Sequence, residues 1–145
     1  MNKLIAICLL LLFVFTACQP EPKPINYGKD ACSFCKMTIA DSRYGAEFVS
    51  DKGKIYKFDA IECMVDYVNK NTEVPFSYLL VNTYDNPKEL VSTTECTFLI
   101  SDNLPSPMGA YLTAFYDKVK ADSMQKVKSG TLYSWNEILN LRKKH

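Results

Sequence analysis

A pattern of nine residues occurs twice in the chain and narrows the folds that it can adopt. Residues 53–61 and 130–138 share the same order: a turn with glycine, a short strand, an aromatic residue, a helix cap and the start of a helix. The two copies are offset by 77 positions. Any strand that runs directly into a capped helix tends to look like this, so the pattern is weak proof of a repeat. It predicts an α+β fold built from two similar units.

Hydrophobic periodicity and turn signals place the other elements around these two segments. Strands are expected at residues 46–50, 54–58, 76–81, 97–100, 111–116 and 131–133. Helices are expected between Asp59 and residues 69–71, at residues 117–127, and after Ser134. The first and the last of these helices each begin with the pattern of a capping box, formed by Asp59 with Glu62 and by Ser134 with Glu137.

The first residues have the features of a bacterial export signal. A charged start is followed by an almost wholly apolar stretch at residues 4–15 and then by Thr16, Ala17 and Cys18. The apolar stretch is too short to span a bilayer comfortably as a helix. We expect residues 1–17 to be a lipoprotein signal peptide and Cys18 to be the lipid anchor. An ordinary cleaved signal is the alternative.

The rest of the chain has the length and charge of one small domain. Residues 18–29 carry three prolines, which indicates an extended tether, and residues 30–145 are long enough to bury a core. Seventeen basic residues face sixteen acidic ones, and one of the lysines lies in the expected signal peptide. A net charge near zero gives no reason to expect a nucleic acid or an acidic substrate as partner.

Four cysteines follow the expected lipid anchor: Cys32, Cys35, Cys63 and Cys96. The first two form a CxxC pair, which is typical of a redox dithiol, half of a zinc site or a clamp for a soft metal. A zinc site would need two further ligands, and the one histidine of the chain is its last residue, His145. Four cysteines in an exported protein also allow two disulfides, in three connectivities. The cysteines alone leave these possibilities open.

Two methionines favour a soft metal. Met37 lies two residues after Cys35, and a thioether is a poor zinc ligand but a good ligand for Cu(I). Met108 stands between Pro107 and Gly109 in an expected loop, without the periodic neighbours of a core methionine. Filling of the core is the alternative for both.

The helix after Asp59 carries two more sulfur atoms. Met64 belongs to its apolar stripe, which predicts a core position, and Cys63 points roughly away from that stripe toward solvent or a second packing layer. Cys96 opens a strand and is expected to be a small buried apolar residue.

Taken in order, these residues resemble the NosL-type copper chaperone lipoproteins, accessory proteins in nitrous oxide reductase maturation. The resemblance covers the lipobox-like Cys18, residues 32–39, residues 53–58 with the following helix that carries Met64, residues 106–109 and residues 114–115. The chain departs from the family pattern at Lys36, where glycine is frequent, and in having no histidine inside the domain.

The resemblance implies a fold similar to the organomercurial lyase core, with two ββαβ-like units packed as one compact domain. It implies a Cu(I) site with ligands at Cys32, Cys35, Met37, Met108 and Met64. It also implies a membrane-anchored protein that faces the periplasm, with nitrous oxide reductase and its maturation and transport machinery as partners.

We therefore expect a non-enzymatic Cu(I) metallochaperone. One alternative is an exported thiol redox protein that uses Cys32 and Cys35, and another is a structural or binding lipoprotein stabilised by disulfides. The roles of Cys63 and Cys96, the client enzyme, and the choice between inner and outer membrane are left open by the sequence.

Overall fold

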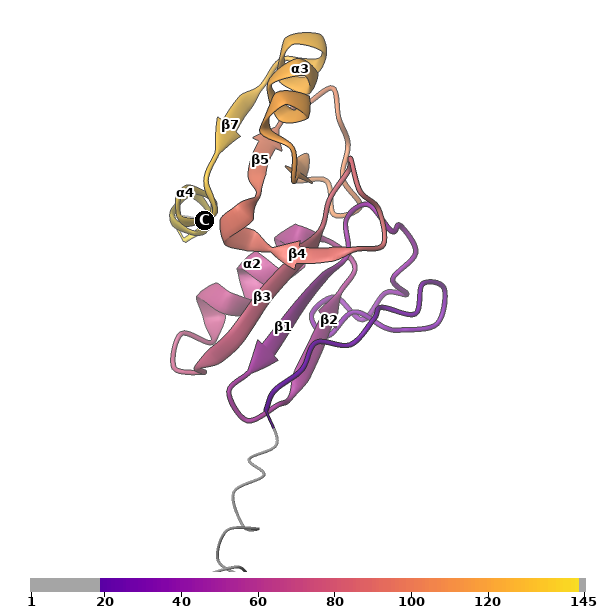
Figure 1. The fold of residues 1–145 in the computed structure, drawn as a ribbon, viewed down its shortest axis with the longest axis vertical. Coiled ribbons are helices and arrows are strands. Elements are labelled where there is room, and N and C mark those ends of the chain that lie inside the picture. The colour runs from indigo at the N-terminus through magenta and orange to yellow at the C-terminus, as the bar shows by residue number, and fades with distance from the viewer. Residues whose placement is uncertain (1–18, 144–145) are drawn as a thin grey trace, which may run out of the picture.

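The structure, a computed structural model, describes residues 19–143 and consists of two successive α+β units (Figure 1). The expected signal peptide, Cys18 and His145 lie outside the described residues. The first unit contains β1 (Ala46–Ser50), β2 (Ile55–Phe58), α2 (Ile61–Lys70) and β3 (Phe76–Asn82), followed by β4 (Leu90–Ser92) and a 3₁₀ helix at Thr93–Glu95. The second unit contains β5 (Thr97–Ile100), β6 (Leu112–Phe115), α3 (Lys118–Lys128) and β7 (Thr131–Tyr133), followed by α4 (Trp135–Arg142).

The expected pair of ββαβ-like units is confirmed. Each unit forms its own antiparallel sheet, with strand order β2-β1-β3-β4 in the first and β6-β5-β7 in the second. In both sheets the first strand of the unit lies in the middle, between the second strand and the strand that follows the helix. The two units therefore share one topology.

The repeated nine-residue pattern does not mark equivalent parts of the two units. Its first copy forms β2 and the start of α2, whereas its second copy forms β7 and the start of α4. β2 is the second strand of its unit, but β7 is the last strand of the other. The similarity reflects a local rule instead: in both places a strand enters a helix that begins at a polar or acidic segment. The two helices pack against each other.

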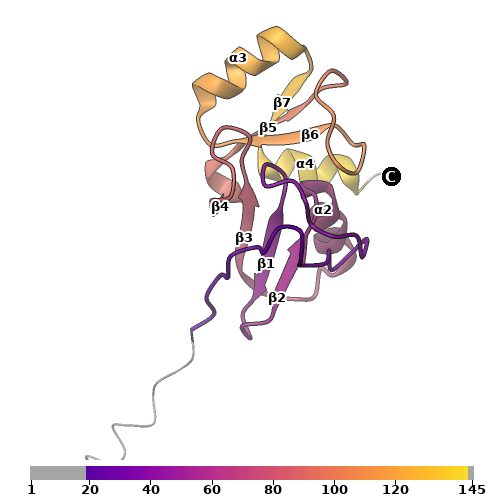
Figure 2. The same cartoon turned by 90° about the vertical axis from the view of Figure 1, so that its right-hand side faces the viewer.

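Three helices within residues 19–143 cover the sheets and join them. α2 packs on the first sheet, α3 packs on the second, and α4 lies between α2 and β5 (Figures 1 and 2). The main core includes residues of both units, among them Phe48, Phe58, Met64, Phe98 and Ile138. Because one apolar core spans both units, they fold as one domain. No helix in this part of the chain has both the length and the apolar character needed to cross a bilayer.

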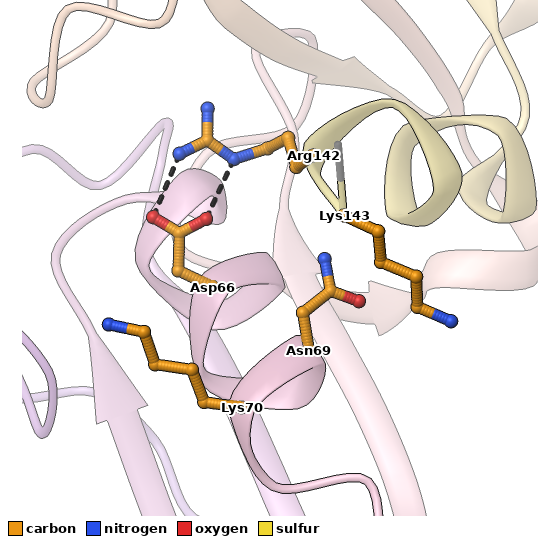
Figure 3. Close-up of a pocket in the computed structure, with 5 residues that line it drawn as sticks. All are labelled: Asp66, Asn69, Lys70, Arg142 and Lys143. Atoms are coloured by element: carbon orange, nitrogen blue, oxygen red, sulfur yellow. Dashed lines mark hydrogen bonds and ion pairs between the residues drawn. The ribbon is translucent and has the colours of Figure 1, made fainter. Parts of the chain in front are cut away.

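Two side-chain contacts hold α4 against α2. The Arg142 guanidinium donates two hydrogen bonds to the Asp66 carboxylate, at 2.9 and 2.8 Å (Figure 3). Asn69 Nδ2 donates to the backbone oxygen of Leu139 at 3.2 Å. Paired guanidinium and carboxylate groups define an orientation as well as a contact. Contacts with α4 of the second unit therefore fix the position of α2, the helix that carries Cys63.

The prediction from sequence was wrong about the cap of α2 and omitted one strand. The N-cap of α2 is Ala60, which has no side-chain cap bond, whereas Asp59 accepts a hydrogen bond from the backbone N–H of Ala40. Asp59 thus fastens the segment after the CxxC pair, a long-range contact that a local pattern does not reveal. β4 was not expected because its three residues, Leu90–Ser92, are too short to show a period and, unlike β7, have neither a glycine turn before them nor an α-helix directly after them. The capping box of Ser134 and Glu137 in α4 is confirmed.

The packed part of the chain begins before residue 30. Ile25 is buried in the main core, and the Tyr27 hydroxyl donates to Asn82 Oδ1 at 2.6 Å. The backbone N–H of Lys23 donates to the buried Glu47 carboxylate at 2.9 Å. Residues 23–29, which the sequence assigned to the tether, are therefore packed along the first sheet.

Replacement of Gly130 with alanine tests the turn between α3 and β7. Gly130 has a φ of +105°, and an added Cβ would meet the backbone oxygen of Ile100 and the side chain of Ser101. We expect the free energy of unfolding to fall by more than the roughly 1–2 kcal/mol that a left-handed backbone alone costs an L-residue. Chemical denaturation of the purified protein measures the loss.

The matched control is Gly53→Ala, since Gly53 has a φ of +76° but open space around its Cα. Only the backbone cost is expected there. Equal losses in the two variants would contradict the role assigned to the contact with Ile100.

Candidate metal site

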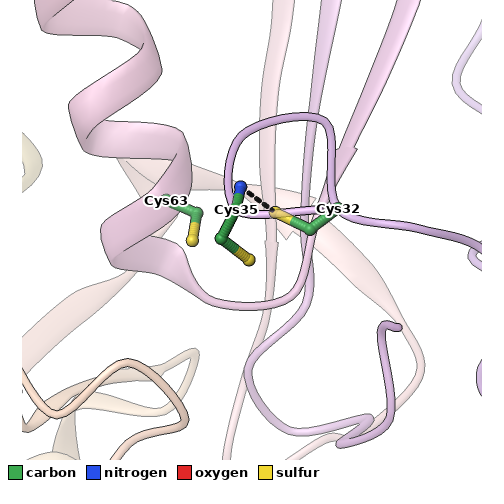
Figure 4. A group of neighbouring side chains, drawn as sticks. All are labelled: Cys32, Cys35 and Cys63. Atoms are coloured by element: carbon green, nitrogen blue, oxygen red, sulfur yellow. Dashed lines mark hydrogen bonds between the residues drawn. The ribbon is translucent and has the colours of Figure 1, made fainter. Parts of the chain in front are cut away.

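Three thiols from two distant segments meet beside the N-terminus of α2. The Sγ atoms of Cys32, Cys35 and Cys63 all lie within 4.8 Å of one another. Figure 4 shows Cys63 projecting from α2 toward the loop that carries the other two. Among residues 19–143 no other group of three or more histidine, cysteine or acidic side chains has this geometry. Three sulfur atoms at this separation can bind one ion.

The CxxC segment is a tight loop closed by its own backbone. Cys32 N–H donates to the backbone oxygen of Met37 at 2.8 Å, and Lys36 N–H donates to the backbone oxygen of Cys32 at 3.1 Å. The backbone N–H of Cys35 points at Cys32 Sγ, at 3.5 Å. Such a loop turns both thiols toward the same side. The spacing of the pair therefore has a direct structural reason.

Lys36 has a φ of +69°, a left-handed conformation that favours glycine. Glycine would adopt this conformation without strain. The side chain offsets part of the strain, since Lys36 Nζ donates to the backbone oxygen of Ser33 at 2.8 Å. The departure at Lys36 therefore preserves the loop.

The loop is fastened to β2, the strand that leads into α2. Ser33 N–H donates to the backbone oxygen of Lys57 at 2.7 Å, and Lys57 N–H donates to Ser33 Oγ at 3.2 Å. The ammonium group of Lys57 also pairs with Asp30 at 2.6 Å. Because β2 ends three residues before α2 begins, this attachment sets the loop opposite the first turn of the helix. Cys63 is the third residue of that turn.

The first turn of α2 is a favourable place for thiolate charge. Backbone N–H groups at a helix N-terminus lack partners inside the helix, and the helix dipole is positive there. Ala60 leaves this end without a side-chain cap. A thiolate or an anionic metal–thiolate group beside Cys63 is therefore stabilised by the helix.

The three thiols differ in their pKa values because their surroundings differ. The neighbouring thiol of Cys63 lowers the pKa of Cys32 to about 4 despite its burial, with a smaller contribution from backbone N–H groups near its sulfur. The interaction with Cys32, followed by burial, raises the pKa of Cys63. Burial is the main cause that raises the pKa of Cys35. Without a metal, the negative charge of the group is therefore centred on Cys32.

The three methionines predicted as ligands have different surroundings. Met37 and Met108 are exposed for such large apolar side chains, with 46% and 39% of their surface accessible. Met64 follows Cys63 on α2 and is fully buried in the main core. The prediction of a core position for Met64 is thus confirmed, and its role as a ligand stays a prediction, as do those of Met37 and Met108.

Cys63 is the site residue that the sequence did not assign. It is 1% exposed and faces the CxxC loop, which forms the second packing layer on that side of α2. Cys96 is also buried but lies outside the group, and its Sγ donates to the backbone oxygen of Ser92 at 3.4 Å. Burial raises the pKa of Cys96 to about 12. All four described cysteines are free thiols.

Comparison with known proteins supports the fold and identifies the family. A search of curated proteins found no match. Among solved structures, the chain is similar to the crystal structure of the copper chaperone NosL from Shewanella denitrificans. The TM-score is 0.70 and the sequence identity 16%, and the match covers 81% of this chain and 95% of that chain. At this identity the similarity establishes the fold.

The sequence model of a family described as NosL matches residues 24–141, which include all three clustered cysteines, Met37, Met64 and Met108. The match spans most of the chain, from the residues that pack along the first sheet to the last helix. This chain belongs to the NosL family.

Proposed function

We propose that this chain is a non-enzymatic carrier of Cu(I) in the bacterial cell envelope, and that it passes copper toward nitrous oxide reductase during maturation of that enzyme. The observation that carries the proposal is the convergence of the Cys32, Cys35 and Cys63 thiols within 4.8 Å. Copper is the cargo of this site, bound for transfer to a client.

The chemistry of the donors favours Cu(I). Thiolates and thioethers are soft ligands, which suit Cu(I) better than hard divalent ions. The group itself consists of cysteine sulfur alone, without a carboxylate or a histidine. The uncapped N-terminus of α2 supports the negative charge that remains when several thiolates bind one monovalent ion.

The exposed thioethers can take part in transfer of Cu(I) to a client. Cys32 and Cys63 are buried, whereas Cys35 is partly accessible and Met37 and Met108 stand at the surface. A copper ion held by buried thiolates is protected from solvent, and weaker thioether donors at the surface are suited to ligand exchange with a client.

The expected export signal supports the lipid anchor, and the family supports the client enzyme. The expected export signal at residues 1–17, directly before Cys18, supports attachment to a membrane on its periplasmic side through lipid on Cys18. The similar Shewanella denitrificans protein is described as a copper chaperone, and the NosL family resemblance supports nitrous oxide reductase and its maturation and transport machinery as partners.

A thiol redox function has one observation in its favour, the lowered pKa of Cys32. A redox thiol must also be reached by its substrate, and Cys32 is only 1% exposed. The more accessible thiol of the pair, Cys35, has a raised pKa, which makes it the weaker nucleophile at neutral pH. The more nucleophilic thiol and the more accessible thiol are thus different residues, which favours metal binding over a redox function.

Anaerobic titration of the purified, reduced protein with Cu(I), in competition with a chromophoric chelator, tests the proposal. We expect one Cu(I) per chain and a sharp loss of affinity in Cys35→Ser. Unchanged affinity in that variant, or binding of Zn(II) without any binding of Cu(I), would contradict the proposed function.

A further inference from the structure

A buried carboxyl group connects the helix of the cysteine group to the loop of Met108. Glu62 immediately precedes Cys63 in the first turn of α2 and is only 1% exposed. The Oγ of Ser106 donates a hydrogen bond to Oε1 of Glu62 across 44 positions of the sequence. Ser106 stands two residues before Met108. The contact therefore links a sequence-predicted ligand in the second unit to the cysteine group in the first.

The loop of Met108 is closed on the same serine. Leu112 N–H donates to Ser106 Oγ at 3.3 Å, and Gly109 N–H donates to the backbone oxygen of Ser106 at 3.1 Å. Met108 thus projects from a short loop whose two ends meet at one hydroxyl group. That hydroxyl is in turn held by Glu62. A change at Ser106 or Glu62 releases the base of the loop.

A role in stability alone does not explain this carboxyl group. Oε1 of Glu62 has its serine partner, but Oε2 is buried and has no hydrogen-bond partner within residues 19–143. Burial of a polar atom without a partner costs free energy, and an apolar side chain would fill the same space without that cost. Metal ligands are commonly held in place by polar partners of this kind.

We propose that Glu62 is a positioning residue for copper binding, which acts through Ser106 to hold the thioether of Met108 toward the cysteine group. This inference rests on the proposed function and adds a residue to it. Glu62 itself need not touch the ion. Its role is to fix the position of the Met108 loop of the second unit relative to Cys63 of the first.

The test is a double-mutant cycle on Cu(I) affinity in the full protein. Ser106→Ala removes the hydroxyl group that joins Glu62 to the loop, and Met108→Ala removes the thioether. Loss of a group that orients a metal ligand typically lowers affinity about 10- to 100-fold. We expect a loss of that size in each single variant and no further loss in the double variant, because both changes remove the same copper–sulfur bond.

Three further variants separate positioning from general damage. Glu62→Ala removes the oxygen that accepts from Ser106 and is expected to lose Cu(I) affinity as Ser106→Ala does, whereas Glu62→Gln keeps an accepting oxygen and is expected to restore most of that affinity. Ser123→Ala is the matched control, because Ser123 makes a single side-chain bond to the backbone oxygen of Val119 on α3. X-ray absorption at the copper edge should show one fewer sulfur neighbour in Ser106→Ala. Because Glu62 loses its partner, the Ser106→Ala apoprotein should unfold at a lower temperature than Ser123→Ala but remain folded at the temperature of the assay.

The possible results distinguish a failure of the positioning role from a failure of the proposed copper function. Additive losses in the cycle, or an unchanged sulfur count in Ser106→Ala, would overturn the positioning role while the copper function stands. An unchanged affinity in Met108→Ala would overturn both the positioning role and the place of Met108 among the ligands. Loss of Cu(I) binding with Cys35→Ser but not with Met108→Ala would identify that second case.

Discussion

Replacement of Cys63 with serine is expected to weaken Cu(I) binding by more than the roughly 100-fold that loss of an orienting group can cost, because it removes a ligand itself. The sulfur atoms of Cys32 and Cys35 have no third thiol partner without Cys63. Serine has nearly the same shape but offers a hard oxygen donor, which Cu(I) binds poorly. Chelator competition under anaerobic conditions, with the apoprotein checked by thermal unfolding, measures the effect.

Cys96→Ser is the matched control for this prediction. Cys96 is also a buried thiol, and its Sγ bonds only to the backbone oxygen of Ser92, which a serine hydroxyl can replace. We expect Cu(I) affinity to stay within a few-fold of the unchanged protein. If Cys96→Ser weakened copper binding as much as Cys63→Ser, the assignment of the site to the three clustered thiols would fail.

The sequence predicted the fold well wherever the signal is local. The strands at 46–50, 97–100 and 131–133 have the bounds that alternation and turn residues indicated, and the helix after Ser134 has its capping box. Local rules failed at Asp59, because its carboxylate bonds to Ala40 instead of capping α2. The choice between those partners depends on tertiary structure, which short-range periodicity does not contain.

The site was predicted only in part for a similar reason. The CxxC pair and Met37 are adjacent in sequence, so their common chemistry is visible without a structure. Cys63 joins them only because Ser33 and Lys57 fasten the loop to β2, which delivers the chain into α2. One local signal was available: a cysteine in the first turn of an expected helix lies where thiolates are stabilised.

The affinity for Cu(I) should rise steeply with pH. Copper binds thiolates, so every thiol that is protonated in the apoprotein must release its proton on binding. The pKa values of Cys35 and Cys63 are raised, whereas that of Cys32 is lowered. At neutral pH one thiolate is therefore already present and two protons must leave. A site that uses all three thiolates should gain about 100-fold in affinity per pH unit over roughly pH 6 to 8.

Both the direction and the slope of the pH dependence of Cu(I) affinity can be checked. Since the raised pKa values oppose binding in acid, affinity must increase with pH; a flat profile would require all three thiols to be ionised or uninvolved. Anaerobic titration in a weakly buffered solution should release two protons per Cu(I), and Cys35→Ser should reduce this to one. Release of two protons in Cys35→Ser as well would show that Cys35 keeps its proton or lies outside the site, and copper would then be held without it.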